Sequence, residues 1–197
     1  MPSHTHSVVG KRVPNVDGWE KVTGTAVYTV DMVLPNMLYG KILRSPHPHA
    51  NIVRIDTSRA ERLPGVKLVL TGKDTPGLKS GIWRSYRELC DEEILCGDKV
   101  RYIGDAVATV AATHEDIAEE ALRLIDVEYE VLPAAFDPLE AMKEGVPEIH
   151  EGCERNMNVY RQIEWGDVEE AFKECDHVRE DNFYCSSQAH AALETHC

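Results

Sequence analysis

The sequence predicts an α+β fold built from short strands in mixed sheets, with few helices. Two observations lead to this fold class. Apolar and polar residues alternate over short runs along much of the chain, as they do in strands with one buried face. Apolar residues at helical spacing are clearest in a single long segment, near residues 114–125. Regular alternation of strands and helices would instead indicate a doubly wound parallel sheet.

The unit with the clearest pattern covers residues 99–133, which we predict as strand, turn, strand, helix and strand. Thr113 is the expected N-cap of the helix, with Asp116 three residues later in a near capping box. The apolar stripe of this helix consists of Ile117, Ala118, Ala121, Leu122 and Ile125. The run "VEYEVL" then alternates as a strand does, and Pro133 ends it.

Four earlier runs have the alternation and composition of strands: residues 25–30, 38–45, 50–57 and 66–72. A short helix is expected after the Thr57-Ser58 cap, and residues 78–97 are expected to form a long loop.

A smaller unit follows a connecting stretch that holds a short helix near Pro138. It should contain a strand at 158–166, a short helix and one or two strands at 176–197. Asp167 is the expected cap of that helix. Its packing residues should be Val168, Ala171 and Phe172.

Composition and charge exclude several classes of protein. Hydrophobic residues make up 43% and charged residues 28%, which is ordinary for a soluble globular protein. The net charge of -13 argues against a nucleic-acid surface. No apolar run approaches the roughly 20 residues of a membrane span, and the N-terminus lacks the apolar core of a signal peptide. The six cysteines have no CxxC spacing, so we expect reduced, buried thiols and a cytoplasmic protein.

Histidines are the residues most suggestive of a metal site. His47 and His49 form a His-x-His pair without an obvious third ligand, which favours a packing role. His190, Glu194 and His196 have the spacing H-x3-E-x-H and would share one face of a strand, where side chains two apart lie about 7 Å from each other. A small metal-binding protein using His190 and His196 is therefore a weaker alternative. Phosphate-binding and G-x-S-x-G motifs are absent from the sequence, and no catalytic residue or metal ligand is assigned.

Three long runs resemble one known domain: "GKRVPNVDGWEKVTGTAVYTVDM", "LYGKILRSPHPHANIVRIDTSRAERLPGVKLVLTGKDTPG" and "DKVRYIGDAVATVAATHEDIAEEALRLIDVEYEVLPAAFDPLEAM". They are similar to the opening, α/β hammerhead domain of the molybdopterin-binding large subunit of the xanthine dehydrogenase/aldehyde oxidase family. Among members of the family, these runs most resemble bacterial proteins with separate subunits, of the hydroxybenzoyl-CoA reductase-like branch. The implied domains are a partly disordered leader at 1–17, the hammerhead domain at 18–135, a connecting segment at 136–156 and the truncated start of the molybdopterin-binding domain at 157–197.

The run "QAHAALETHC" resembles the family stretch Q-x-H-x-x-x-E-x-H-C. By this resemblance Gln188 binds the cofactor, where it hydrogen-bonds an oxygen ligand of molybdenum. Ser186 and Ser187 stand where xanthine-type relatives often have glycines, and their larger side chains would alter the approach of the backbone. Reductase-like relatives do not all keep the glutamine, so Gln188 favours a hydroxylase. Glu194 is given a structural role and not that of the catalytic base.

The resemblance implies an N-terminal fragment of a molybdenum hydroxylase large subunit that is inactive alone. The substrate would be a heterocycle, an aldehyde or an aromatic thioester. Electrons would pass to an iron–sulfur subunit and an FAD subunit, in a dimer of heterotrimers, and the fragment itself would hold no molybdopterin. Strands from Asn182 onward should lack neighbours and expose apolar faces. The alternative is a stand-alone hammerhead-fold binding or assembly module without molybdenum.

Overall fold

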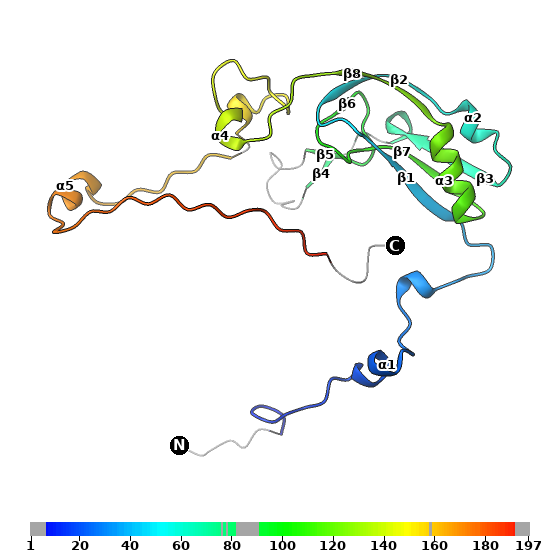
Figure 1. The fold of residues 1–197 in the computed structure, drawn as a ribbon, viewed down its shortest axis with the longest axis horizontal. Coiled ribbons are helices and arrows are strands. Elements are labelled where there is room, and N and C mark those ends of the chain that lie inside the picture. The colour runs from blue at the N-terminus through cyan, green and yellow to red at the C-terminus, as the bar shows by residue number, and fades with distance from the viewer. Residues whose placement is uncertain (1–6, 76, 78, 82–90, 158, 192–197) are drawn as a thin grey trace. The chain divides into compact units, whose positions relative to one another are not determined.

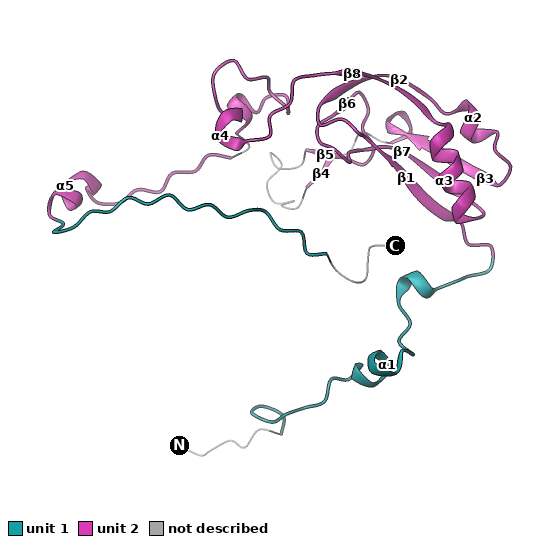
Figure 2. Cartoon of the chain, in the orientation of Figure 1, with its two compact units in different colours: residues 1–35, 175–197 teal, residues 36–174 magenta. Residues whose placement is uncertain are grey.

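The structure, a computed structural model, describes residues 7–75, 77, 79–81, 91–157 and 159–191 (Figure 1). The chain divides into two compact units, coloured separately in Figure 2. One unit is Asn36–Glu174, and the other combines Met1–Pro35 with Cys175–Cys197. None of the helices described has both the length and the apolar character needed to cross a membrane.

The first sheet of the larger unit has the strand order β1-β7-β3, with both pairs antiparallel. Its strands are β1 (Tyr39–Arg44), β3 (Val66–Thr71) and β7 (Ala106–Ala112). The central strand, β7, has the sequence AVATVAA. Its small and β-branched side chains suit a position between two strands, because they pack closely on both faces of the sheet.

A second antiparallel sheet has the order β6-β2-β8. It consists of β2 (Ala50–Asp56), β6 (Lys99–Val100) and β8 (Asp126–Val131). The short strands β4 (Lys79–Ser80) and β5 (Glu92–Glu93) form a separate antiparallel pair within the region expected to be a long loop, part of which lies outside the described residues. Small sheets with few helices confirm the α+β fold class.

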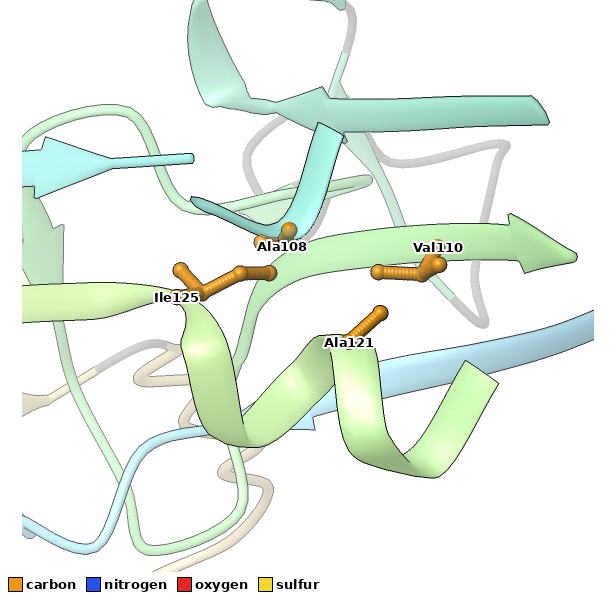
Figure 3. Packing of buried hydrophobic residues seen from close by; sticks show 5 residues of the cluster. Ala108, Val110, Ala121 and Ile125 are labelled. Carbon is orange, nitrogen blue, oxygen red and sulfur yellow. The ribbon is translucent and has the colours of Figure 1, made fainter. Parts of the chain in front are cut away.

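The helix of the clearest sequence pattern is α3 (Glu115–Leu124), and its apolar stripe is confirmed. Ala118 and Ala121 are fully buried. Figure 3 shows Ala121 and Ile125, from α3 and its C-terminal end, pointing toward Ala108 and Val110 of β7. The short helix α2 (Ser58–Glu61) adds the buried Ala60 to the same cluster.

The cap predicted for α3 is wrong. The N-cap is His114, which makes no side-chain capping hydrogen bond. Thr113 instead donates its backbone N–H to the Gly65 carbonyl at 2.9 Å, so it remains tied to the turn before β3. The backbone of Thr113 is thus bound to a segment 48 residues away in sequence, and its hydroxyl oxygen lies 3.1 Å from His114 Nδ1.

A second buried cluster joins the two sheets. Its core is Ala50, Cys96, Val100 and Val107. Ile55 of β2 and Val127 of β8 pack against both this cluster and the one under α3. The two sheets therefore share one continuous apolar core, and this core holds the larger unit together.

Three predicted strands are wrong, because residues 25–30 and the described parts of 158–166 and 176–197 contain no strand. The helix α1 (Gly18–Thr23) and a 3₁₀ turn at Thr29–Asp31 lie near the first of them. A strand requires a neighbour that accepts and donates its backbone hydrogen bonds, and alternation alone does not supply one. Phe183 and Tyr184 are 89% and 92% exposed, as expected for a segment without neighbours.

The last helix, α5 (Val168–Lys173), is capped as predicted. The Asp167 carboxylate accepts a hydrogen bond from the Glu170 N–H at 3.0 Å. The predicted packing of its apolar side chains is wrong, since no residue of α5 is buried. Local capping is therefore sufficient to form this helix without the burial of an apolar face.

Candidate functional site

Gln188 is the residue assigned to the cofactor, and it lies in the extended segment 176–191 of the smaller unit. Its side chain is exposed, and its Nε2 group donates a hydrogen bond to the Ser186 hydroxyl at 3.0 Å. A primary amide has a second N–H and a carbonyl oxygen with which to bind another group. The structure therefore presents Gln188 as an accessible, neutral hydrogen-bonding residue, and its role toward a cofactor stays a prediction.

Of the suggested motif His190, Glu194 and His196, only His190 lies in the described residues, and its side chain is exposed. In the part of the chain that the structure describes, no three His, Cys, Asp or Glu side chains are grouped to hold a metal ion. The alternative of a metal site that uses His190 and His196 therefore stays untested.

The His-x-His pair has the packing role that the sequence favours. His49 is 2% exposed, and its Nδ1 lies 2.7 Å from the Pro133 carbonyl oxygen. Because a carbonyl only accepts, the Nδ1 atom must carry the proton. The ring of His47 meets the ring of Tyr129 edge to face, with centroids 5.0 Å apart. His49 thus binds the chain that follows β8, and His47 packs against Tyr129 of β8 itself.

Four cysteines lie in the described residues, and none of them forms a disulfide there: Cys96, Cys153, Cys175 and Cys185. Of these, only Cys96 is buried, so the expectation of buried thiols is wrong for Cys175 and Cys185, which are exposed. Burial, together with the Asp105 carboxylate, raises the pKa of the Cys96 thiol well above its usual range. A thiol that resists deprotonation is a poor nucleophile, and Cys96 is therefore a core residue.

A polar cavity of about 300 Å³ lies beside Cys96. Its lining residues are Ser80, Asp91, Glu92, Glu93, Cys96, Arg101, Tyr102, Asp105 and His150. His150 Nδ1 is 3.4 Å from Asp91 Oδ2, and both side chains are about one-third exposed. The two residues are 59 positions apart in the sequence, so no local motif predicts their contact.

Burial lowers the pKa of His150 from its ordinary value, because a partly desolvated imidazolium is disfavoured. Asp91 and Asp105 act in the opposite direction, while Arg101 and Lys79 add to the lowering. The folded protein therefore favours the neutral imidazole beside the Asp91 carboxylate.

Lowering the pH should reduce the free energy of unfolding, because His150 becomes protonated more readily in the unfolded chain. The unfolded chain binds a proton there near the ordinary pKa of about 6.5, and the folded chain does so only at lower pH. Since the unfolded state then holds more protons, the free energy of unfolding falls as the pH drops from about 6.5 toward the lower folded-state pKa. His150→Gln cannot titrate, so its urea midpoint should drop less than that of the wild type between pH 7 and 5. An NMR titration that gave His150 an ordinary or raised pKa would contradict this expectation.

Two family models match the chain in succession. The first, described as "Aldehyde oxidase and xanthine dehydrogenase, a/b hammerhead domain", matches residues 23–133. The chain belongs to this family. The second, described as "Molybdopterin cofactor-binding domain", matches residues 149–197. The aldehyde oxidase/xanthine dehydrogenase family thus accounts both for the two sheets with α3 and for the segment that carries Gln188.

Curated relatives of this family share substantial sequence identity with the chain. It is 44% identical to a probable xanthine dehydrogenase subunit of Bacillus subtilis, over 91% of this chain and 23% of that protein. It is 41% identical to the nicotinate dehydrogenase large molybdopterin subunit of Eubacterium barkeri, over 96% of this chain and 43% of that protein. The chain therefore spans about a quarter of the length of the first relative and less than half of the length of the second.

Solved structures of the family share the fold. The aldehyde oxidoreductase of Desulfovibrio gigas superimposes with a TM-score of 0.65 at 35% identity, over 71% of this chain and 16% of that one. The CO dehydrogenase of Oligotropha carboxidovorans gives 0.62 at 34% identity, over 70% and 17%. The hammerhead architecture is confirmed, whereas the domain bounds drawn from the sequence stay a prediction.

Proposed function

We propose that this chain is the hammerhead domain and the start of the cofactor-binding domain of a molybdopterin-dependent hydroxylase large subunit. The observation that carries the proposal is the order of the two family matches, residues 23–133 followed by 149–197. The second match includes Gln188. The chain would act as part of a longer polypeptide, because its relatives are several times its length.

The substrate we propose is an N-heterocycle with an electron-poor ring carbon. Relatives of the chain are named for xanthine, nicotinate and nicotine, and a structural relative for quinoline. Each of these compounds contains a ring nitrogen, which makes the neighbouring carbons electron-poor. An aldehyde is the second candidate, supported by the aldehyde oxidoreductase structures. An aromatic thioester, the substrate of the hydroxybenzoyl-CoA reductase-like branch, has no such support among these names.

The proposed role of this chain in catalysis is orientation. When bound, molybdopterin supplies the two-electron redox chemistry of the hydroxylation. Gln188 would donate its amide hydrogen to an oxygen atom at the cofactor, where a preorganised donor stabilises negative charge that develops during the reaction. The hammerhead core would hold the start of the cofactor-binding segment in a defined place.

Electron transfer requires partners, which we propose to be an iron–sulfur subunit and an FAD subunit. The names "large molybdopterin subunit" and "dehydrogenase complex subunit gamma" of two relatives support a multi-subunit enzyme. We place the complex in the cytoplasm, where an exposed thiol such as that of Cys185 stays reduced.

The test is the intact mass and metal content of the native protein, purified from its source cells. We expect a polypeptide several times heavier than 22.1 kDa that carries molybdenum and copurifies with iron–sulfur and flavin subunits. The purified complex should oxidise at least one of xanthine, nicotinate and quinoline. A native polypeptide of 22.1 kDa without molybdenum would refute the proposal and favour the stand-alone binding or assembly module.

A further inference from the structure

The stretch at 137–157, which covers most of the gap between the two family matches and the start of the second match, is folded and not an open linker. It begins with the single-turn helix α4 (Pro138–Ala141). The Asp137 carboxylate caps this helix and accepts hydrogen bonds from the N–H groups of Leu139 and Glu140, at 2.8 and 3.0 Å. Pro138 at the first helical position adds a backbone already set for a helix. The start of the segment is thus defined by its own residues.

The side chain of Asn156 closes the segment on itself. Its Nδ2 group donates to the carbonyl oxygens of Ala141 at 3.0 Å and Pro147 at 3.1 Å. Its Oδ1 atom accepts from the Ile149 N–H at 2.8 Å. These three bonds reach 15, 9 and 7 residues back along the chain. One carboxamide therefore satisfies backbone groups at three separate points of the same loop.

The backbone at Asn156 is set for this role. Arg155 and Asn156 both have φ of 55°, in the left-handed region. Asparagine enters this region more readily than most residues, while arginine is held there at a cost. The Arg155 Nε group donates to the Met142 carbonyl at 2.8 Å, which adds a fourth bond between the end of the segment and the end of α4.

The closed segment also touches the hammerhead core. His150 lies beside Asp91, and the Lys99 ammonium is 3.8 Å from the Glu151 carboxylate. The side chain of Lys99 is 16% exposed and that of Glu151 is 83% exposed, so this ion pair lies at the surface and contributes little to stability. A cavity of about 310 Å³ is shared by the two parts, with Asp91, Ala135, Ala141, Ile149, His150, Cys153 and Asn156 around it.

We propose that Asn156 is a positioning residue that locks residues 141–157 into a rigid clip between the hammerhead core and the cofactor-binding segment. The inference rests on the proposed function, because a rigid clip at residues 141–157 has a positioning role only if the segment that follows it binds a cofactor. The clip begins eight residues after the end of the first family match, at residue 133, and includes the first residues of the second match, which starts at residue 149. A preordered connection reduces the conformational entropy lost when the next domain assembles on it.

Hydrogen exchange of the 197-residue chain tests the clip with three variants. Asn156→Ala removes the side-chain bonds and the left-handed preference, whereas Asn156→Gly removes the bonds and keeps the backbone freedom. Asn51→Ala is the matched control, because Asn51 also donates one side-chain bond, to Glu130 at 2.9 Å, but lies outside the clip on β2. The Ile149 amide should exchange roughly tenfold faster in both Asn156 variants, and not in the control.

Amides of β7 serve as an internal reference and should be unchanged in all three variants. If Ile149 in Asn156→Gly exchanged as slowly as in the wild type, the side-chain bonds would not hold the clip and the inference would be overturned. The same holds if the wild-type amide exchanged at the rate of an unstructured peptide.

A second readout follows the attachment of the clip to the hammerhead core. Release of the clip should expose His150, so its pKa in Asn156→Ala should rise from the lowered wild-type value toward about 6.5. An unchanged pKa would overturn the attachment. Neither readout involves molybdenum, so a chain that lacks the cofactor in cells would refute the proposed function and leave the exchange result standing.

Discussion

Gly72→Ala should destabilise the hammerhead unit by about 3 kcal/mol, near the upper end for overpacking in a closed space. A Cβ atom on Gly72 would lie 2.4 Å from the Cys96 carbonyl oxygen and 2.6 Å from the Gly97 Cα. Both obstacles are backbone atoms, which cannot rotate away as a side chain can. The opposing backbone is also tied in place, since the Cys96 N–H donates to the Ala106 carbonyl at 2.7 Å.

Urea unfolding of the 197-residue chain measures this effect, with Gly40→Ala as the matched control. Gly40 lies in β1 of the first sheet, and a Cβ atom there would meet nothing within 4 Å. Neither glycine has a positive φ, so the comparison isolates steric overlap from backbone strain. Equal midpoints for the two variants would show that the 3₁₀ turn Gly72–Asp74, which follows β3, approaches the Cys96-Gly97 backbone less closely than the structure indicates.

Gln188→Ala in the proposed molybdenum-loaded enzyme should lower kcat by about 10²- to 10³-fold. The size of the loss follows from the removal of one preorganised hydrogen-bond donor at a site where charge develops. The molybdenum content should not change, because the proposed role of the neutral Gln188 amide is to donate a hydrogen bond and not to ligate the metal. Steady-state kinetics with an N-heterocycle, together with metal analysis, measures both quantities.

Gln162→Ala is the control for this experiment. Gln162 is also an exposed glutamine, hydrogen-bonded only to its near neighbours Tyr160 and Glu164 in the described structure. Its replacement should leave kcat unchanged. Loss of molybdenum from the Gln188→Ala enzyme would assign Gln188 to cofactor retention and contradict the hydrogen-bonding role. An unchanged kcat would place Gln188 away from the reacting centre.

Local patterns predicted the elements whose partners lie close in sequence. The unit from Lys99 to Val131 was predicted in the right order, and the buried positions Ala118 and Ala121 of α3 follow directly from helical spacing. The cap of α5 at Asp167 was likewise predicted, because a capping carboxylate acts within one turn. Such features depend on residues three or four positions apart, and the sequence displays them.

Patterns were misleading where an element requires a distant partner. The alternation at residues 25–30 and 176–191 is that of a strand, but no neighbouring strand pairs with either run in the described structure. The N-cap of α3 is His114 and not Thr113, whose N–H is bound by the distant Gly65 carbonyl. Neither outcome can be inferred when each segment is considered by itself.

By itself the sequence determined the α+β class, the order of the central elements and, through long ordered motifs, the family and the candidate Gln188. Only the tertiary structure placed Gly72 against Cys96, His150 beside Asp91 and Asn156 within reach of three separate carbonyl and amide groups. The reason is physical. Helical and strand periodicity is a property of near neighbours, whereas steric contacts and buried polar pairs form only when packing has brought distant segments together.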